Sequence, residues 1–146
     1  MKNQVLRMIA ITSVVMVASV VSAHAQAGNT VVVRIPFDFN VAGKTLPAGQ
    51  YVISRSTPTS SEGLLIRNEK RGAHVQTKTV KTQELQEQTQ VIFKRYGDEY
   101  FLFQLWTSGR STGRELFRST KEQALEREYA RLATKPETLA VKGQAR

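Results

Sequence analysis

The sequence predicts a mainly β protein, an antiparallel β-sandwich or small barrel with an amphipathic helix at its C-terminal end. Three observations support this fold class. Short runs of β-branched and aromatic residues alternate with turn signals between Asn29 and Phe117. Two of these runs flank Gly97-Asp98, a dipeptide typical of tight hairpins. After Arg118 the apolar spacing changes to three and four residues, which indicates a helix.

The first 25 residues have the pattern of a secretory signal peptide. Lys2 and Arg7 form a basic segment, and the 14 residues that follow are apolar or small. This run is shorter than the ~20 residues that span a membrane. Ala23-His24-Ala25 places small residues where signal peptidase requires them. We therefore expect cleavage between Ala25 and Gln26, and export to the periplasm or the medium.

Composition limits the chemistry and the partners of the mature chain. Cleavage leaves 121 residues, enough for a single domain, which we place at 26–133. The absence of cysteine excludes disulfides, thiol chemistry and a cysteine-linked lipid anchor. Without Lys2 and Arg7 the chain has 19 basic and 12 acidic residues, a net charge of +7. This charge suits an anionic glycan or a lipid head group, and export argues against nucleic acid. The basic residues are scattered, so solubility is the favoured explanation of this charge.

The first predicted strand is Thr30–Phe39, in which odd positions from Val33 onward are apolar. Pro36 cannot donate a hydrogen bond, so an edge strand or a bulge is expected there. Turns are predicted at residues 42–44 and 46–49. Further strands are expected at residues 51–55, 64–67, 73–80 and 114–118, with polar connections at 56–63 and 82–90, the second of which has room for a helical turn.

The hairpin formed by residues 91–96 and 99–106 is the predicted centre of the fold. Gly97 suits the first position of a two-residue type II′ turn. That turn pairs Phe93 with Leu102 and Ile92 with Phe103. It makes both faces of the hairpin apolar, so we expect both faces to be covered.

A helix is predicted at about 119–133. Ser119 and Glu122 have the spacing of a capping box. Leu125, Tyr129 and Leu132 then form an apolar stripe suited to packing on a sheet. Pro136 ends the helix, and residues 134–146 are expected to be a disordered polar tail.

Catalytic signals are scarce, and the sequence predicts no enzyme, metal site or cofactor site. His74 is the one histidine of the mature chain, on the polar face of a predicted strand. A hydrolase would need a pair of acids with one raised pKa. Asp38 and Glu115 are the candidates, but a solvent-facing Asp38 and an arginine-paired Glu115 are favoured.

The candidate binding patch consists of Tyr100, Trp106, Arg110 and Arg114. Aromatic faces stack on sugars, and guanidinium groups bind carboxylate or phosphate through two parallel hydrogen bonds. Arg118 continues the four-residue spacing of the arginines. For Trp106, a place in the core is favoured over a place in this patch.

Three motifs resemble those of a family of small exported proteins associated with Acidobacteria-type soil bacteria. They are I-P-F-D-F at Ile35–Phe39, L-P-A-G-Q-Y-V-I at Leu46–Ile53, and R-Y-G-D-E-Y-F-L with a following W-x-x-G at Arg95–Gly109. The resemblance extends from Val31 to about Leu125. It implies export and a shared β fold, and it transfers no activity and no site residues.

The leading functional hypothesis is an exported, non-enzymatic envelope protein that binds or scaffolds a partner. A lipocalin-like carrier of a small ligand is the alternative, and a hydrolase is the third. A cavity lined by Trp106, Phe93 and Leu102 would favour the carrier, whereas a filled interior would favour the binding module.

Overall fold

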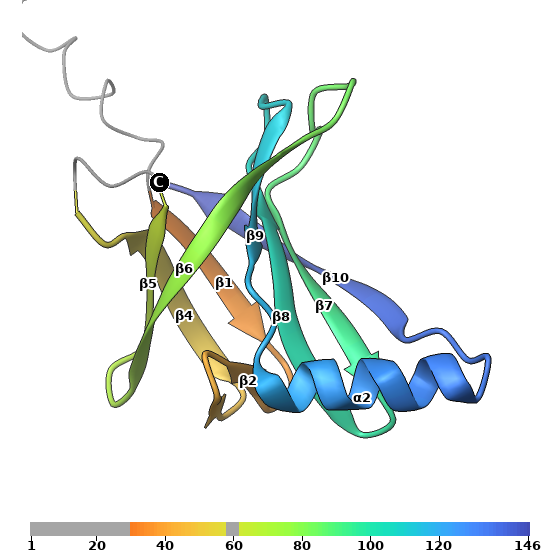
Figure 1. Ribbon diagram of the computed structural model, residues 1–146. Helices are drawn as coiled ribbons and strands as arrows, with labels where there is room; N and C mark the ends of the chain where they lie inside the picture. The colour runs from red at the N-terminus through yellow and green to blue at the C-terminus, as the bar shows by residue number, and fades with distance from the viewer. Residues whose placement is uncertain (1–29, 58–61) are drawn as a thin grey trace, which may run out of the picture.

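The computed structural model describes residues 30–57 and 62–146, so the predicted signal peptide, its cleavage site at Ala25 and Gln26, and residues 58–61 lie outside the described residues. Figure 1 shows strands surrounding a common core and one helix beside them. The elements in chain order are β1 (Thr30–Ile35), β2 (Phe39–Val41), β3 (Lys44–Leu46), β4 (Gly49–Arg55), β5 (Gly63–Arg67), β6 (Gly72–Lys81), β7 (Gln90–Tyr96), β8 (Glu99–Trp106), β9 (Thr112–Leu116), α2 (Thr120–Arg131) and β10 (Glu137–Ala145).

Eight strands form a closed antiparallel barrel in the order β8, β7, β10, β1, β4, β5, β6, β9. Closure occurs because β9 pairs with β6 on one side and with β8 on the other. The prediction of a mainly β protein is therefore confirmed, and of its two architectures the barrel is the one that forms. Closing the ring removes the exposed strand edges that an open sheet would leave.

The barrel interior is filled with side chains. Alternate residues of β1 point inward, and Val31, Val33 and Ile35 are each at most 3% exposed. One cluster of buried residues extends through the barrel: Val31, Val33, Ile35, Phe39, Val41, Leu46, Tyr51, Ile53, Leu64, Ile66, Ala73, Val75, Val91, Phe93, Leu102, Leu105 and Leu116. Burial of this apolar surface is the main stabilising contribution to the fold.

Aromatic rings close one end of the barrel. The first predicted strand ends early, at Ile35, because Pro36 cannot continue the ladder. The chain then crosses to β8, where Asn40 is the parallel partner of Phe101. The Phe37 ring stacks on Tyr100 at 3.9 Å and meets Phe93 edge-on at 5.1 Å. The β2–β3 hairpin and α2 lie at this same end (Figure 1).

The β7–β8 hairpin forms as predicted, and Gly97 has the positive φ of 61° that its turn requires. The pairing of Phe93 with Leu102 is confirmed. The pairing of Ile92 with Phe103 is wrong, because the register shifts between Ile92 and Phe93 and Ile92 faces Gln104. This bulge directs Leu105 inward, whereas strict alternation from Leu102 would have directed Gln104 and Trp106 inward.

Helix α2 packs on the outer face of this hairpin. Tyr129 meets Tyr96 edge-on at 5.1 Å, and Tyr96 in turn meets Phe101 at 5.6 Å. Half of the predicted capping box is confirmed: Ser119 Oγ accepts a hydrogen bond from the Glu122 amide at 3.2 Å, whereas the buried Glu122 Oε1 has no hydrogen-bond partner among the described residues. The predicted stripe is wrong at its last member, because Leu132 is 67% exposed. Leu132 ends the helix and lies beyond the covered part of the hairpin.

The expectation of a disordered tail at 134–146 is wrong. Residues 137–145 form β10, which pairs Leu139 with Phe93 of β7 and Gly143 with Val33 of β1. The sequence does not indicate this strand, because β10 has no strongly apolar face. Backbone pairing with β1 and with β7 holds it in place. Among the described residues, no helix is long and apolar enough to cross a membrane.

Candidate functional site

The barrel contains a small hollow at the end opposite the aromatic rings. Its volume is about 80 Å³. Its floor is apolar, formed by Val31, Ile53, Leu64 and Leu105 from four barrel strands. Its rim is polar and contains Arg55, Thr79, Thr107, Arg110, Thr112, Gly113 and Arg114. We call this hollow and its rim the barrel mouth.

Three arginines reach the barrel mouth from different segments. Arg55 is the last residue of β4 and follows the inward-facing Tyr51 and Ile53 at the same two-residue period. Arg114 lies in β9, where it pairs with Leu105 of β8 and Thr79 of β6. Its Nη1 donates a hydrogen bond to Thr79 Oγ1 at 2.8 Å, which orients the guanidinium.

Arg110 is held by backbone bonds between two connecting loops. The Gln86 amide donates to the Arg110 carbonyl at 3.0 Å, and the Gly109 amide donates to the Gln86 carbonyl at 2.8 Å. Gly109 has φ 74°, a conformation that favours glycine. The connection at 82–90 contains no helical turn; it supports the loop that carries Arg110 instead.

The positive charge of the barrel mouth is only partly offset, through the charge of Glu62. Burial lowers the pKa of Arg114, the neighbouring charge of Arg55 lowers it further, and Glu62 acts in the opposite direction. All twelve acidic residues of the chain are among the described residues. Even so, none of the three arginines makes an ion pair within that part of the chain. Like charges without a carboxylate partner favour binding of an anion.

The structure brings together only part of the predicted patch. Arg110 and Arg114 meet at the barrel mouth, whereas Tyr100 stacks on Phe37 at the opposite end. The expectation of a core Trp106 is also wrong, because Trp106 lies on the outer face, where its Nε1 donates to Gln104 Oε1 at 3.0 Å. Arg118 pairs with Glu126 of α2 at 2.8 Å. The prediction that these groups form one patch is therefore wrong for both aromatic residues.

Arg55 is the site residue that sequence reasoning missed. Its signal was present, because the alternation of Tyr51 and Ile53 places position 55 on the inward face. It was overlooked because an arginine at the end of a predicted strand is usually a solvated residue. Trp106 was misplaced for a different reason: the β7–β8 bulge exchanges the faces of the last residues of β8.

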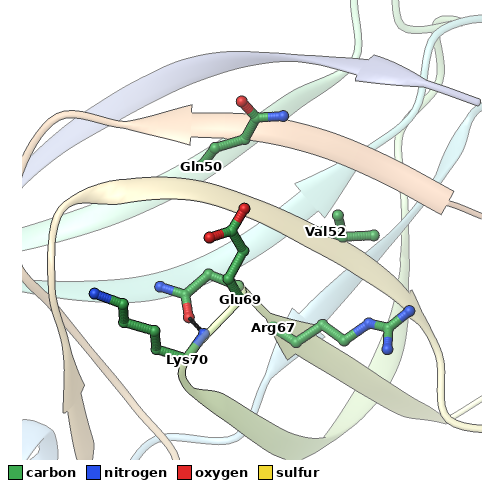
Figure 2. A pocket seen from close by; sticks show the side chains of 6 residues that line it. Gln50, Val52, Arg67, Glu69 and Lys70 are labelled. Carbon is green, nitrogen blue, oxygen red and sulfur yellow. Dashed lines mark hydrogen bonds between the residues drawn. The ribbon is translucent and has the colours of Figure 1, made fainter.

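A second hollow lies on the outer face of β4 and β5. Figure 2 shows Gln50 and Val52 of β4 beside Arg67, the last residue of β5, and Glu69 and Lys70 of the turn that follows β5. This groove measures about 710 Å³ and mixes charges of both signs. Its Asn68 Oδ1 is occupied within the turn, since it accepts from the Lys70 amide at 2.9 Å and the Arg71 amide at 2.6 Å. Such an arrangement stabilises a turn and defines no ligand chemistry.

The acids considered for hydrolysis are separately engaged. Asp38 Oδ1 accepts from the Ala48 amide at 2.8 Å. Burial raises the pKa of Glu115, but hydrogen bonds from Lys78 and Gln104 outweigh this effect and hold it below its ordinary value. The Lys78 ammonium is 2.9 Å away. A depressed pKa is the opposite of what a general acid needs. His74 is exposed on the outer face of β6.

The acid with a raised pKa lies away from the barrel mouth. Glu122 of α2 is 4% exposed, and burial raises its pKa although Lys94 and Arg118 act against this. Burial, with the charge of Glu122, also raises the pKa of Tyr96 to about 12. These groups lie between the helix and the hairpin, so they bear on helix docking rather than on a binding site.

Fold and site together define a small closed β-barrel with an arginine-rich mouth. The chain matches no protein-family model, and comparisons with curated proteins and with solved structures give no significant match. The resemblance to the Acidobacteria-type family stays a prediction.

Proposed function

We propose that the mature protein is an exported, non-enzymatic binding module of the bacterial envelope that holds an anionic partner at its barrel mouth. The observation that carries this proposal is the convergence of Arg55, Arg110 and Arg114 on one hollow, where none of the described lining residues is a carboxylate. The excess of basic residues in the whole chain supports the same sign of partner. The N-terminal sequence supports export.

The filled interior favours a binding module over a carrier. A carrier would need an internal cavity near Phe93 and Leu102, yet both residues are at most 5% exposed and belong to the packed core. Pockets that enclose small molecules usually measure ~300–1,000 Å³. The hollow of about 80 Å³ is too small to enclose such a ligand. Part of a partner fits there, with the rest remaining outside.

Native mass spectrometry of the mature protein, gently purified from its own producing cells, tests this proposal. We expect protein that carries an anionic partner, and we expect the Arg110→Gln variant to lose it. Arg67→Gln is the matched control, because it removes one positive charge from the outer groove instead. An apolar ligand of a few hundred daltons retained by both variants would overturn the proposal in favour of a carrier.

A further inference from the structure

We infer that Arg55, Arg110 and Arg114 form a site for a single phosphate group, which enters the barrel mouth while the molecule that bears it stays outside. This inference rests on the proposed function and names the ligand class for the same site. It follows from four properties of the barrel mouth: its size, its charge, its hydrogen-bond donors and the absence of an aromatic platform.

The size of the hollow limits the ligand to a head group. The hollow of about 80 Å³ is several times smaller than the ~300–1,000 Å³ pockets that enclose a whole small molecule, so only a compact group such as a tetrahedral oxyanion fits it. A sugar ring or an acyl chain is larger, and below the hollow the packed residues Ile53 and Leu105 block deeper entry.

The charge of the site favours a doubly charged anion. Three guanidinium groups without an ion-pair partner in the described part of the chain attract a dianion more strongly than a carboxylate. Phosphate monoesters carry about −1.5 to −2 at neutral pH. The planar donor fork of arginine also matches phosphate oxygens in a two-bond arrangement. Anion binding would relieve the repulsion among the three cations.

Hydroxyl groups at the rim supply further donors. Thr79 Oγ1 accepts its hydrogen bond from Arg114, so its own proton remains available for donation. Thr107 and Thr112 also line the hollow. A phosphate has enough acceptor oxygens to use these hydroxyls together with the guanidinium groups.

The rim offers no surface on which a sugar could stack. Tyr100 is at the opposite end of the barrel, and Trp106 lies on the outer face. Of the described residues that line the hollow, none is aromatic. Recognition of a glycan through ring stacking is therefore not built into this site, whereas recognition of a phosphate is.

The test uses mature wild-type protein and three probes at low salt: inorganic phosphate, vesicles of phosphatidylcholine alone, and vesicles that also contain phosphatidic acid. Calorimetry follows phosphate binding, and co-sedimentation follows the vesicles. The variants are Arg55→Gln, Arg110→Gln and Arg114→Gln. The control is Arg67→Gln, which has the same net charge as each of these variants. Circular dichroism checks folding, and Arg110 is exposed in a loop, so its variant tests the site even if the others unfold.

We expect saturable binding that weakens about tenfold or more in each folded site variant and less than twofold in the control. Binding of inorganic phosphate alone would indicate a free or soluble phosphate as the source. Binding only to vesicles with phosphatidic acid would indicate a lipid head group. Either result supports the inference.

Two results would overturn the inference. One is the absence of saturable binding to every phosphate probe, and the other is an equal loss in Arg67→Gln, which would indicate attraction to net charge alone. The proposed function and the phosphate assignment can be tested independently of each other. If the cell-derived protein still carries a non-phosphate anion that Arg110→Gln releases, the binding module stands and only the phosphate assignment is wrong.

Discussion

Arg114 and Leu105 are direct partners across the ladder between β8 and β9, and both line the barrel mouth. An inward-facing apolar residue of β8 thus lies beside a guanidinium that belongs to a cluster of three. Leu105 is inward because of the β7–β8 bulge, and Arg114 is inward because it is paired with Leu105. This pair marks the boundary between the packed core and the charged rim.

Replacing Arg114 with Met should stabilise the unliganded protein at low ionic strength. The variant loses a partly buried charge and its repulsion with Arg55 and Arg110. We expect a gain of a few tenths to about 1 kcal/mol, because solvent screens a group that is partly exposed. Urea unfolding at low and high salt measures the effect, which should shrink as salt screens the repulsion. An equal loss of stability at both salt concentrations would show that Arg114 is a structural residue without a repulsive partner.

Replacing Glu122 with Gln should stabilise the protein at neutral pH. The folded state raises the pKa of Glu122 above its ordinary value of 4.5, so the folded state binds the proton more tightly than the unfolded state. The contribution of Glu122 is most favourable below pH 4.5 and is lost as the pH rises through its folded pKa. We expect Glu122→Gln to add roughly 1 kcal/mol at pH 7 and little at pH 4.

Urea unfolding between pH 4 and pH 8 measures this difference. Glu128→Gln is the control, because Glu128 lies on the same helix and is exposed. Its effect should stay within about 0.5 kcal/mol. A stability difference between Glu122→Gln and wild type that is the same at both ends of the pH range would contradict the raised pKa.

Replacing Phe39 with Ala should remove most of the stability of the barrel. The Phe39 ring is fully buried and meets Tyr51 at 5.1 Å and Phe93 at 5.6 Å. Loss of such a ring costs about 3–5 kcal/mol. Phe117→Ala is the matched control, since Phe117 is 64% exposed and should change stability by less than about 0.5 kcal/mol. Thermal unfolding distinguishes the two, and similar midpoints would contradict the closed aromatic end.

Replacing Gly143 with Ala should weaken the attachment of β10. An added Cβ would lie 3.1 Å from Val31 Cγ1 and 3.2 Å from the Val32 carbonyl oxygen. We expect a cost of about 1–2 kcal/mol, since the neighbouring strand must shift to make room. Gln144→Ala, at the next and exposed position, should be nearly neutral. Hydrogen exchange of β10 amides provides a second measurement, and exchange as fast in wild type as in Gly143→Ala would argue against a paired strand.

Local patterns predicted much of the fold. The Gly97-Asp98 hairpin, the Ser119 cap and most strands follow from turn chemistry and from two-residue alternation, which depend on neighbouring residues. Barrel closure does not follow from such patterns, because it depends on pairing between β9 and β8 and between β10 and both β1 and β7. Those strands are brought together by the whole chain.

The candidate site was predictable only in part for a related reason. Arg110 and Arg114 are close in sequence and were singled out together, whereas Arg55 joins them through the β4–β5–β6–β9 succession of ladders. Trp106 was misassigned because a single bulge reverses which residues of β8 face inward. A bulge adds one residue to one strand, and no composition or spacing signal in the hairpin marks it.

The most direct test of the arginine-lined mouth is an NMR titration of ¹⁵N-labelled mature protein with inorganic phosphate, observed at the arginine side-chain Nε–H groups. We expect saturable shifts for Arg55, Arg110 and Arg114 at one common dissociation constant, with Arg67 and Arg118 unaffected. Weak, non-saturating shifts of similar size at all arginines would contradict a phosphate site at the barrel mouth, because they would show that phosphate responds to net charge alone.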